Sequence, residues 1–166
     1  MSVERLYITS MQSPLGLLVV KGNAEAIVEV QFAETPLPTD SHVPEHMKQC
    51  ILQLEEYFAG KRSSFDLPIR PQGTPFQQNV WDILLQIGYA GTSTYLELSK
   101  LLGDEKKARA VGAATGANPI AVIIPCHRLV GSDHSLTGYA GGIWRKQWLL
   151  AHEALHGRGV QRLFDL

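Results

Sequence analysis

The sequence has few cysteines, little net charge and no long apolar run. Only 2 of its 166 residues are cysteine, the formal net charge is −1, and aromatic residues make up 8%. No stretch reaches the length of about 20 apolar residues that a transmembrane helix needs. The first ten residues, MSVERLYITS, do not join a basic segment to a long apolar one. We therefore expect no secretory signal, no membrane partner and a cytoplasmic location.

Two cysteines leave little room for disulfide or metal chemistry. A reducing compartment disfavours a bond between Cys50 and Cys126, and the chain has no CxxC pair. We therefore predict that it binds no metal. It also lacks a phosphate-cradling loop and a dinucleotide fingerprint, so we expect it to work without a cofactor.

What the sequence does contain is the composition of an ordinary soluble globular protein, with 45% hydrophobic and 19% charged residues. The charge is divided unevenly. Residues 1–70 hold 6 Lys and Arg against 9 Asp and Glu, or −3, whereas residues 71–166 hold 9 against 7, or +2. The net charge of the whole chain gives no sign of nucleic-acid binding, and we expect any polyanion partner to meet the second half of the chain.

Residues 1–70 are predicted to form a small α/β domain. Three segments alternate between polar and apolar residues as strands do, and the turn signals between them indicate an antiparallel meander. These segments are 5–10, 16–21 and 26–32. Apolar residues then recur at helical spacing from residue 45 to residue 59, before Gly60. They are Met47, Cys50, Ile51, Leu54 and Phe58. Residues 63–73 break this pattern and are the candidate linker.

Residues 71–166 are predicted to form a second, mainly helical domain. Thr74-Pro75 is a strong start signal for its first helix, as a cap followed by proline at the first helical position. The apolar run IAVII at 120–124 predicts a short buried strand or extended segment. We expect a last helix from near Ile143 to near Glu153.

Two further helices are expected between these elements. Thr94 and Glu97 have the spacing of a capping box at the start of one helix, which Gly103 ends. Asp104 can cap the next helix, which we expect to run to about Thr115. Two short helices joined by a glycine-containing turn are typical of a helix-turn-helix.

One of the two cysteines lies in an unusual setting, the stretch NPIAVIIPCHRLVGSDHSLTGYAGG at residues 118–142. Cys126 follows an apolar run and a proline and precedes His127 and Arg128. A neighbouring base or cation favours the thiolate, which is the nucleophilic form of cysteine. Adjacency alone is weak evidence, because consecutive side chains in an extended segment point apart. A buried structural cysteine therefore remains an open alternative.

Several motifs that occur together and in order favour a functional cysteine over a structural one. They are GTPFQQNVW at 73–81, KKARAVGAATGANP at 106–119, PCHR at 125–128, GYAGG at 138–142 and WLLAHE at 148–153. This region resembles the active-site half of the O6-alkylguanine-DNA alkyltransferases, also called methylated-DNA–protein-cysteine methyltransferases. The resemblance is dense over residues 73–153 and extends to the N-terminal half only in general layout. It implies a ribonuclease-H-like N-terminal domain, followed by a winged-helix-like domain with a helix-turn-helix.

The resemblance also implies roles for four residues. Cys126 matches the acceptor that takes the alkyl group from guanine O6 in one displacement. His127 matches the histidine that withdraws the thiol proton through a water, and Glu153 matches the carboxylate that orients this histidine. Together the three residues would form a catalytic triad with a cysteine nucleophile. Tyr95 matches the tyrosine that hydrogen-bonds the base and can deliver a proton to the leaving guanine.

The same resemblance implies how double-stranded DNA with an alkylated guanine is held. Arg109 matches the arginine that enters the base stack when the damaged nucleotide is flipped out, on a helix that lies in the minor groove. Asn118 matches a hinge residue that ties this helix to the active-site loop. The carbonyls of Cys126 and Leu129 match contacts to the exocyclic amine of the base, the N–H of Ala140 matches a contact to O6, and Tyr139 matches a pocket wall. Lys106 and Lys107 lie beside the arginine in the sequence and are further candidates for DNA contact. The family further implies a monomer.

Each of these residues has a plainer explanation when taken alone. Tyr95 could be a core residue, Glu153 a solvated carboxylate, and Arg109 with its lysines a solvated basic face. The sequence also departs from the family pattern, because Gly88-Tyr89-Ala90-Gly91-Thr92 stands where Pro-Tyr-Gly-Thr is usual. Two other functions stay open. One is a module that recognises alkylated DNA without repairing it, and the other is a cysteine hydrolase that uses Cys126 and His127.

Overall fold

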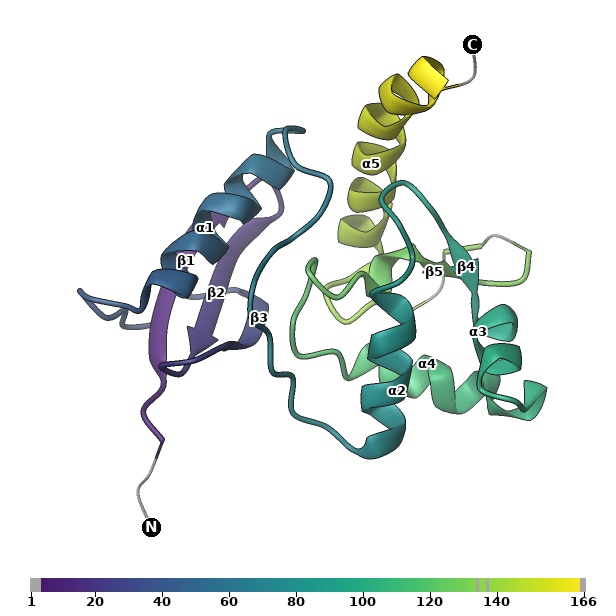
Figure 1. Cartoon of the computed structure of the whole chain (residues 1–166), viewed down its shortest axis with the longest axis horizontal. Helices are drawn as coiled ribbons and strands as arrows, with labels where there is room; N and C mark the ends of the chain where they lie inside the picture. Colours follow the sequence, from purple (N-terminus) through teal and green to yellow (C-terminus); the bar gives the residue numbers. More distant parts are fainter. Residues whose placement is uncertain (1–3, 134, 137, 165–166) are drawn as a thin grey trace. The chain divides into compact units, whose positions relative to one another are not determined.

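The computed structural model describes residues 4–133, 135–136 and 138–164, with side chains up to residue 157. The chain divides into two compact units (Figure 1). Unit 1 comprises Met1–Gln72 with Pro119–Ala121, and unit 2 comprises Gly73–Asn118 with Val122–Leu166. A single domain boundary between residues 70 and 71 stays a prediction. In the described ranges, no helix combines the length and apolar character that crossing a bilayer requires.

Unit 1 is an antiparallel three-stranded sheet covered by one helix. Strands β1 (Tyr7–Ser13), β2 (Gly16–Gly22) and β3 (Ile27–Ala33) pair in chain order as the predicted meander. Helix α1 (Glu45–Phe58) lies across one face of this sheet (Figure 1). Its buried residues recur at helical spacing, which gives the helix one apolar face for the sheet. They are Met47, Cys50, Gln53, Leu54 and Tyr57.

The segment at 120–124, expected to be a short buried strand or extended segment, is buried but is mostly a turn. Only Ile120 forms a bridge, with Val30 of β3, supported by hydrogen bonds of 2.9 Å on either side of it. The next residues turn sharply, and Val122 has a left-handed φ of 69°. The Asn118 amide donates to the carbonyl of Ile124, six residues later, at 2.9 Å and closes this turn.

Unit 2 begins with helix α2 (Pro75–Leu84), which starts where the sequence predicts. The Thr74 hydroxyl accepts from the Gln77 N–H, and the Gln77 side chain accepts from the Thr74 N–H, so that a capping box is complete. Trp81 joins α2 to a later helix, because its indole N–H donates to the carbonyl of Ala114 at 2.9 Å.

The predicted helix-turn-helix is present. Helix α3 (Tyr95–Leu101) is capped by the Thr94 hydroxyl, and Gly103, with φ of 88°, makes the turn after it. Asp104 caps a short 3₁₀ helix, η1 (Glu105–Lys107), rather than the next α-helix directly. Helix α4 (Ala108–Gly116) follows without a break.

The cysteine segment lies between a short strand pair and the last helix. Cys126–Arg128 forms the 3₁₀ turn η2, directly before β5 (Leu129–Val130), which pairs in parallel with β4 (Ser93–Thr94). Helix α5 (Ile143–Phe164) begins where predicted but runs well beyond Glu153. Glycines after residue 156 suggest an earlier end, but a helix tolerates single glycines at a cost of about 1 kcal/mol each. The predicted fold class, an α/β unit followed by a mainly helical unit, is confirmed.

Candidate active site

Cys126 lies in the wall of a cavity of about 360 Å³ within unit 2, a volume in the range typical of small-ligand sites. Cys126 as a whole is only 5% exposed. The cavity wall consists of Tyr95, Arg109, Gly112, Thr115, Gly116, Cys126, Gly138 and Tyr139. Four residues singled out from the sequence therefore line the same cavity, although they are far apart in the chain. They are Tyr95, Arg109, Cys126 and Tyr139.

The resting thiol of Cys126 is protonated at neutral pH. Burial raises its pKa to about 12, although a hydrogen bond from Asn118 and the charge of Lys146 act in the opposite direction. Adjacency suggests that Arg128 favours the thiolate, and the structure differs from this expectation. The Arg128 guanidinium is engaged with Glu153 and with the carbonyl of Ile87. For this sulfur to act as a nucleophile, the proton must therefore leave it.

The candidate acceptor of this proton is His127, the next residue in the chain. Its Nε2 lies 2.6 Å from Oε2 of Glu153, and both side chains are buried. Burial lowers the pKa of His127 below its ordinary value of 6.5, despite the carboxylate beside it. The imidazole is therefore neutral and donates its Nε2–H to Glu153. Its lone pair is then on Nδ1, a buried atom without a hydrogen-bond partner in the described part of the chain.

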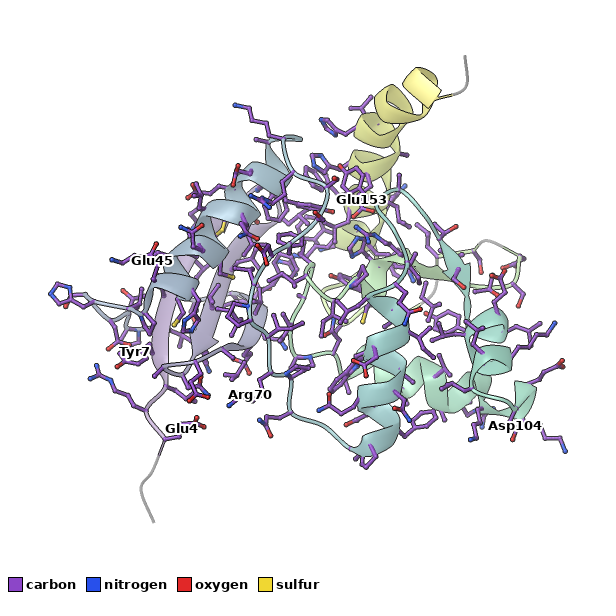
Figure 2. The ribbon with its side chains drawn as sticks, in the orientation of Figure 1. Glu4, Tyr7, Glu45, Arg70, Asp104 and Glu153 are labelled. Atoms are coloured by element: carbon purple, nitrogen blue, oxygen red, sulfur yellow. The ribbon has the colours of Figure 1, made fainter. Side chains whose placement is uncertain are left out.

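Glu153 is held by three groups and stays ionised. It lies near the middle of α5 (Figure 2) and accepts from His127, from Arg128 at 2.8 and 3.1 Å, and from the Ala90 N–H at 3.1 Å. Burial alone would raise its pKa, but the hydrogen bonds and charges of His127 and Arg128 outweigh burial and hold the pKa well below its ordinary range. A fixed negative charge thus lies behind the imidazole.

Arg109 lies on the face of α4 that borders the cavity. It is the second residue of the helix and is exposed. Gly112 and Gly116 follow it at helical spacing on the cavity wall. Lys106 and Lys107 lie in η1 just before this helix, exposed and outside the cavity wall.

The other expected contact residues surround the cysteine turn. Asn118 joins the end of α4 to this turn through its bonds to Ile124 and to Cys126. Leu129 is buried, and its N–H donates to the carbonyl of Cys126. The Tyr139 hydroxyl is buried without a partner among the described residues. Ala140 is exposed in the loop before α5 and does not line the cavity.

Comparison with known proteins shows which protein family has this arrangement of residues. Residues 75–155 match the family model of the 6-O-methylguanine DNA methyltransferase DNA-binding domain, and residues 6–71 match that of the ribonuclease-like domain of the same family. The chain belongs to the 6-O-methylguanine DNA methyltransferase family. The family predicted from the sequence is thereby confirmed, and so is a ribonuclease-like N-terminal part.

Individual relatives agree with the family models over nearly the whole chain. A methylated-DNA–protein-cysteine methyltransferase of Methanosarcina acetivorans is 42% identical over 156 residues, which cover 89% of this chain and 98% of the relative. The crystal structure of Mycobacterium tuberculosis O6-methylguanine methyltransferase aligns with a TM-score of 0.82 at 38% identity, over 92% of this chain and 94% of that one. A structure of the Mycobacterium tuberculosis protein in complex with DNA has a TM-score of 0.80 at 40% identity, over 89% and 92% of the two chains.

Two buried cations of this family member were missed in the sequence. Arg128 was noted only as a neighbour of the cysteine, whereas it binds both oxygens of Glu153. Lys146 is 0% exposed, with Nζ 3.5 Å from the carbonyl of Gly138 and 5.9 Å from the centre of the Tyr95 ring. A signal existed for Lys146, because its spacing from Leu149 and Glu153 places it on the buried face of α5.

One sequence pattern in this methyltransferase has a different use from the one its letters suggest. Residues 152–156 read HEALH, the spacing with which zinc proteases bind their metal. Here both oxygens of Glu153 are engaged by His127 and Arg128, and His152 stacks on Trp148 with ring centres 4.6 Å apart. Among the described residues, no group of three His, Cys, Asp or Glu side chains could hold a metal ion.

The buried histidine and carboxylate predict acid sensitivity of this family member. The pKa of folded His127 lies below 6.5 and that of Glu153 below 4.5, so the unfolded chain binds more protons in acid. The free energy of unfolding should therefore fall as the pH drops below about 6.5, by up to about 1.4 kcal/mol per pH unit for one proton, and again below about 4.5.

Urea denaturation at a series of pH values measures this dependence. In His127→Gln the fall between about pH 6.5 and 5 should largely disappear, because this variant has no imidazole to protonate at that site. Equal slopes in the two proteins would contradict the assignment of a buried neutral imidazole.

Proposed function

We propose that this protein repairs DNA by direct reversal of alkylation damage. In this proposal, Cys126 takes the alkyl group from O6 of an alkylated guanine in one irreversible, single-turnover transfer. The observation that carries the proposal is the joint placement of Cys126 in a cavity wall and of a neutral His127, backed by ionised Glu153, next to it in the chain. Membership of a family with a DNA-binding domain supports DNA as the partner.

The chemistry balances within these residues and the DNA. The proton of Cys126 passes to Nδ1 of His127, through a water as the family resemblance implies, and Glu153 stabilises the resulting imidazolium. The sulfur lone pair forms the new S–C bond while the C–O6 bond breaks, and its electrons remain on guanine. Tyr95 donates a proton to this poor leaving group. The product thioether has no leaving group, so each protein molecule reacts once.

The damaged base must leave the stack before it can enter the cavity, at a cost of a few kcal/mol. We infer that α4 lies in the minor groove and that Arg109 fills the vacated place. Lys106 and Lys107 would then be near phosphates, where positive charge gives affinity without sequence preference.

Recognition of the flipped base is assigned to the cavity and the loops around it. The carbonyls of Cys126 and Leu129 would accept from the exocyclic amine of guanine, and the N–H of Ala140 would donate to O6. Tyr139 would form a wall of the pocket, and Asn118 would couple α4 to the cysteine turn. We further propose that the protein acts as a monomer in the cytoplasm.

Lys146 provides a test of the electrostatic part of this mechanism. Its charge lowers the pKa of Cys126, so Lys146→Met should raise this pKa further and slow alkyl transfer by about tenfold. Burial lowers the pKa of Lys146 itself to about 8, so the apolar variant should be at least as stable as the wild type.

The measurement for this variant is the rate of Cys126 carbamidomethylation by iodoacetamide against pH, together with the transfer rate. Lys100→Met is the control, because Lys100 is an exposed lysine on α3. An unchanged transfer rate in Lys146→Met would rule out a role for its charge at the sulfur.

A stoichiometric assay tests the proposed function against its two alternatives. Duplex DNA with a labelled methyl group on guanine O6 is titrated with protein, and the label should pass to Cys126 at one methyl per molecule and then stop. Binding without transfer would instead indicate a recognition module. Continued turnover on an ester or amide substrate would indicate a hydrolase.

A further inference from the structure

The carboxylate of Glu153 depends on one backbone contact from a loop distant in sequence. The N–H of Ala90 donates to Oε1 of Glu153 at 3.1 Å. Ala90 has a left-handed φ of 65°, a conformation that only glycine adopts without cost. The loop is therefore held in an unfavourable backbone conformation where its N–H meets the carboxylate.

A glycine of α5 makes room for this contact. Gly157 lies one helical turn after Glu153, on the same face of α5. A Cβ added to Gly157 would lie 2.5 Å from the Cβ of Ala90, which is far inside van der Waals contact. The next nearest atoms, at 3.8 Å in Tyr89 and 3.9 Å in Ala90, would be at ordinary distances. The obstruction is thus a single methyl group.

We propose that Gly157 is a positioning residue for alkyl transfer, because its missing side chain lets the Ala90 N–H reach the carboxylate that orients His127. This inference rests on the proposed function only in one respect, because its test includes the rate of alkyl transfer. Arg128 also holds Glu153 but approaches from the turn that contains the cysteine. The Ala90 contact therefore holds the Glu153 carboxylate from a second segment of the chain. Contacts from two segments restrict rotation of this side chain.

The loop has space to move if it is pushed. Ala90 borders a second cavity, of about 250 Å³, together with Val130, Leu150 and the Glu153 side chain. An added methyl on Gly157 is therefore expected to displace the loop rather than to unfold the helix. Displacement would lengthen the Ala90–Glu153 bond and leave the carboxylate held by Arg128 and His127 alone.

A double-mutant cycle tests this inference. G157A should slow alkyl transfer by about tenfold to a hundredfold, the range for a small misplacement of a catalytic group. In the A90G background the opposing methyl is absent, so that G157A should change the rate by less than about threefold. G88A is the matched control, because it adds a methyl group to the same loop where no atom lies within 4 Å, and it should react like the wild type.

Two readouts separate positioning from a general structural effect. Affinity for undamaged duplex should be the same in all variants, since α4 is not touched. The rate of Cys126 carbamidomethylation by iodoacetamide against pH, measured without DNA, should shift in G157A and return in the double variant. This second readout also separates the two proposals. If the wild type transfers no methyl but the thiol reactivity follows this order, the proposed function fails and the positioning role stands.

Three results would overturn the inference. The first is a G157A protein with wild-type transfer and wild-type thiol reactivity. The second is a G157A/A90G protein as slow as G157A, which would show that the methyl of Ala90 is not the obstruction. The third is a loss of rate in G157A that is matched by equal loss of DNA affinity.

Discussion

Glu153→Gln is expected to slow alkyl transfer by about a hundredfold to ten-thousandfold, as loss of the carboxylate does in other nucleophile–histidine–acid triads. The glutamine amide keeps the shape of the side chain but has one acceptor oxygen where three donor groups converge. Its NH₂ group must then face a donor of His127 or Arg128. The imidazolium formed during the reaction would also lose the negative charge that stabilises it.

The same substitution should lower the free energy of unfolding by about 3–5 kcal/mol, because it leaves the buried Arg128 charge without a counter-charge. Glu56→Gln is the matched control. Glu56 pairs with Arg62 at 3.3 Å in a partly exposed position, and such pairs contribute at most about 1 kcal/mol. Single-turnover kinetics and urea denaturation of both variants measure the two effects. Equal destabilisation of the two proteins would refute the account of the Glu153 network.

Cys126→Ala should abolish methyl transfer and leave affinity for damaged duplex largely intact, because the sulfur is the acceptor and not an anchor for DNA. The other cysteine is an unusually close control. Cys50 is also buried, and burial raises the pKa of its thiol to about 12 as well. Both thiols are therefore protonated at neutral pH, and Cys126 differs in lining the cavity and in preceding His127.

Cys50→Ala should transfer methyl at the wild-type rate and lose stability, by about 1 kcal/mol or more for a truncation in a packed core. Transfer rates, duplex affinity and denaturation midpoints of the two alanine variants give the comparison. Residual transfer in Cys126→Ala would mean that another residue is the acceptor.

The local structure of this protein was largely predictable from its sequence. Thr74-Pro75 and Thr94 begin their helices as capping rules require, and the alternation of residues 7–33 gives the meander. Such signals act over a few residues and need no tertiary information. The prediction failed at 120–124, where the contact of Asn118 with Ile124 overrides the strand tendency of the apolar run.

The site was predictable only through the resemblance, because its residues lie far apart in the chain. Nothing local brings Tyr95, Cys126 and Glu153 together. Lys146 and Arg128 were missed since charged residues are usually at the surface, and their burial depends on how α5 packs. The contact between Ala90 and Gly157 depends on a single methyl group at a loop–helix approach, which no pattern in the sequence indicates.

The central claim is that Cys126 accepts an alkyl group from DNA, and the mass of the protein after exposure to damaged duplex tests it most directly. Protein mixed with an equimolar duplex carrying O6-methylguanine should gain the net mass of one CH2 group, because the methyl replaces the thiol hydrogen. Peptide mapping should place this methyl on the peptide that contains Cys126, and the DNA should then contain ordinary guanine. An unmodified protein beside unrepaired DNA, or a methyl group found on Cys50, would contradict the account.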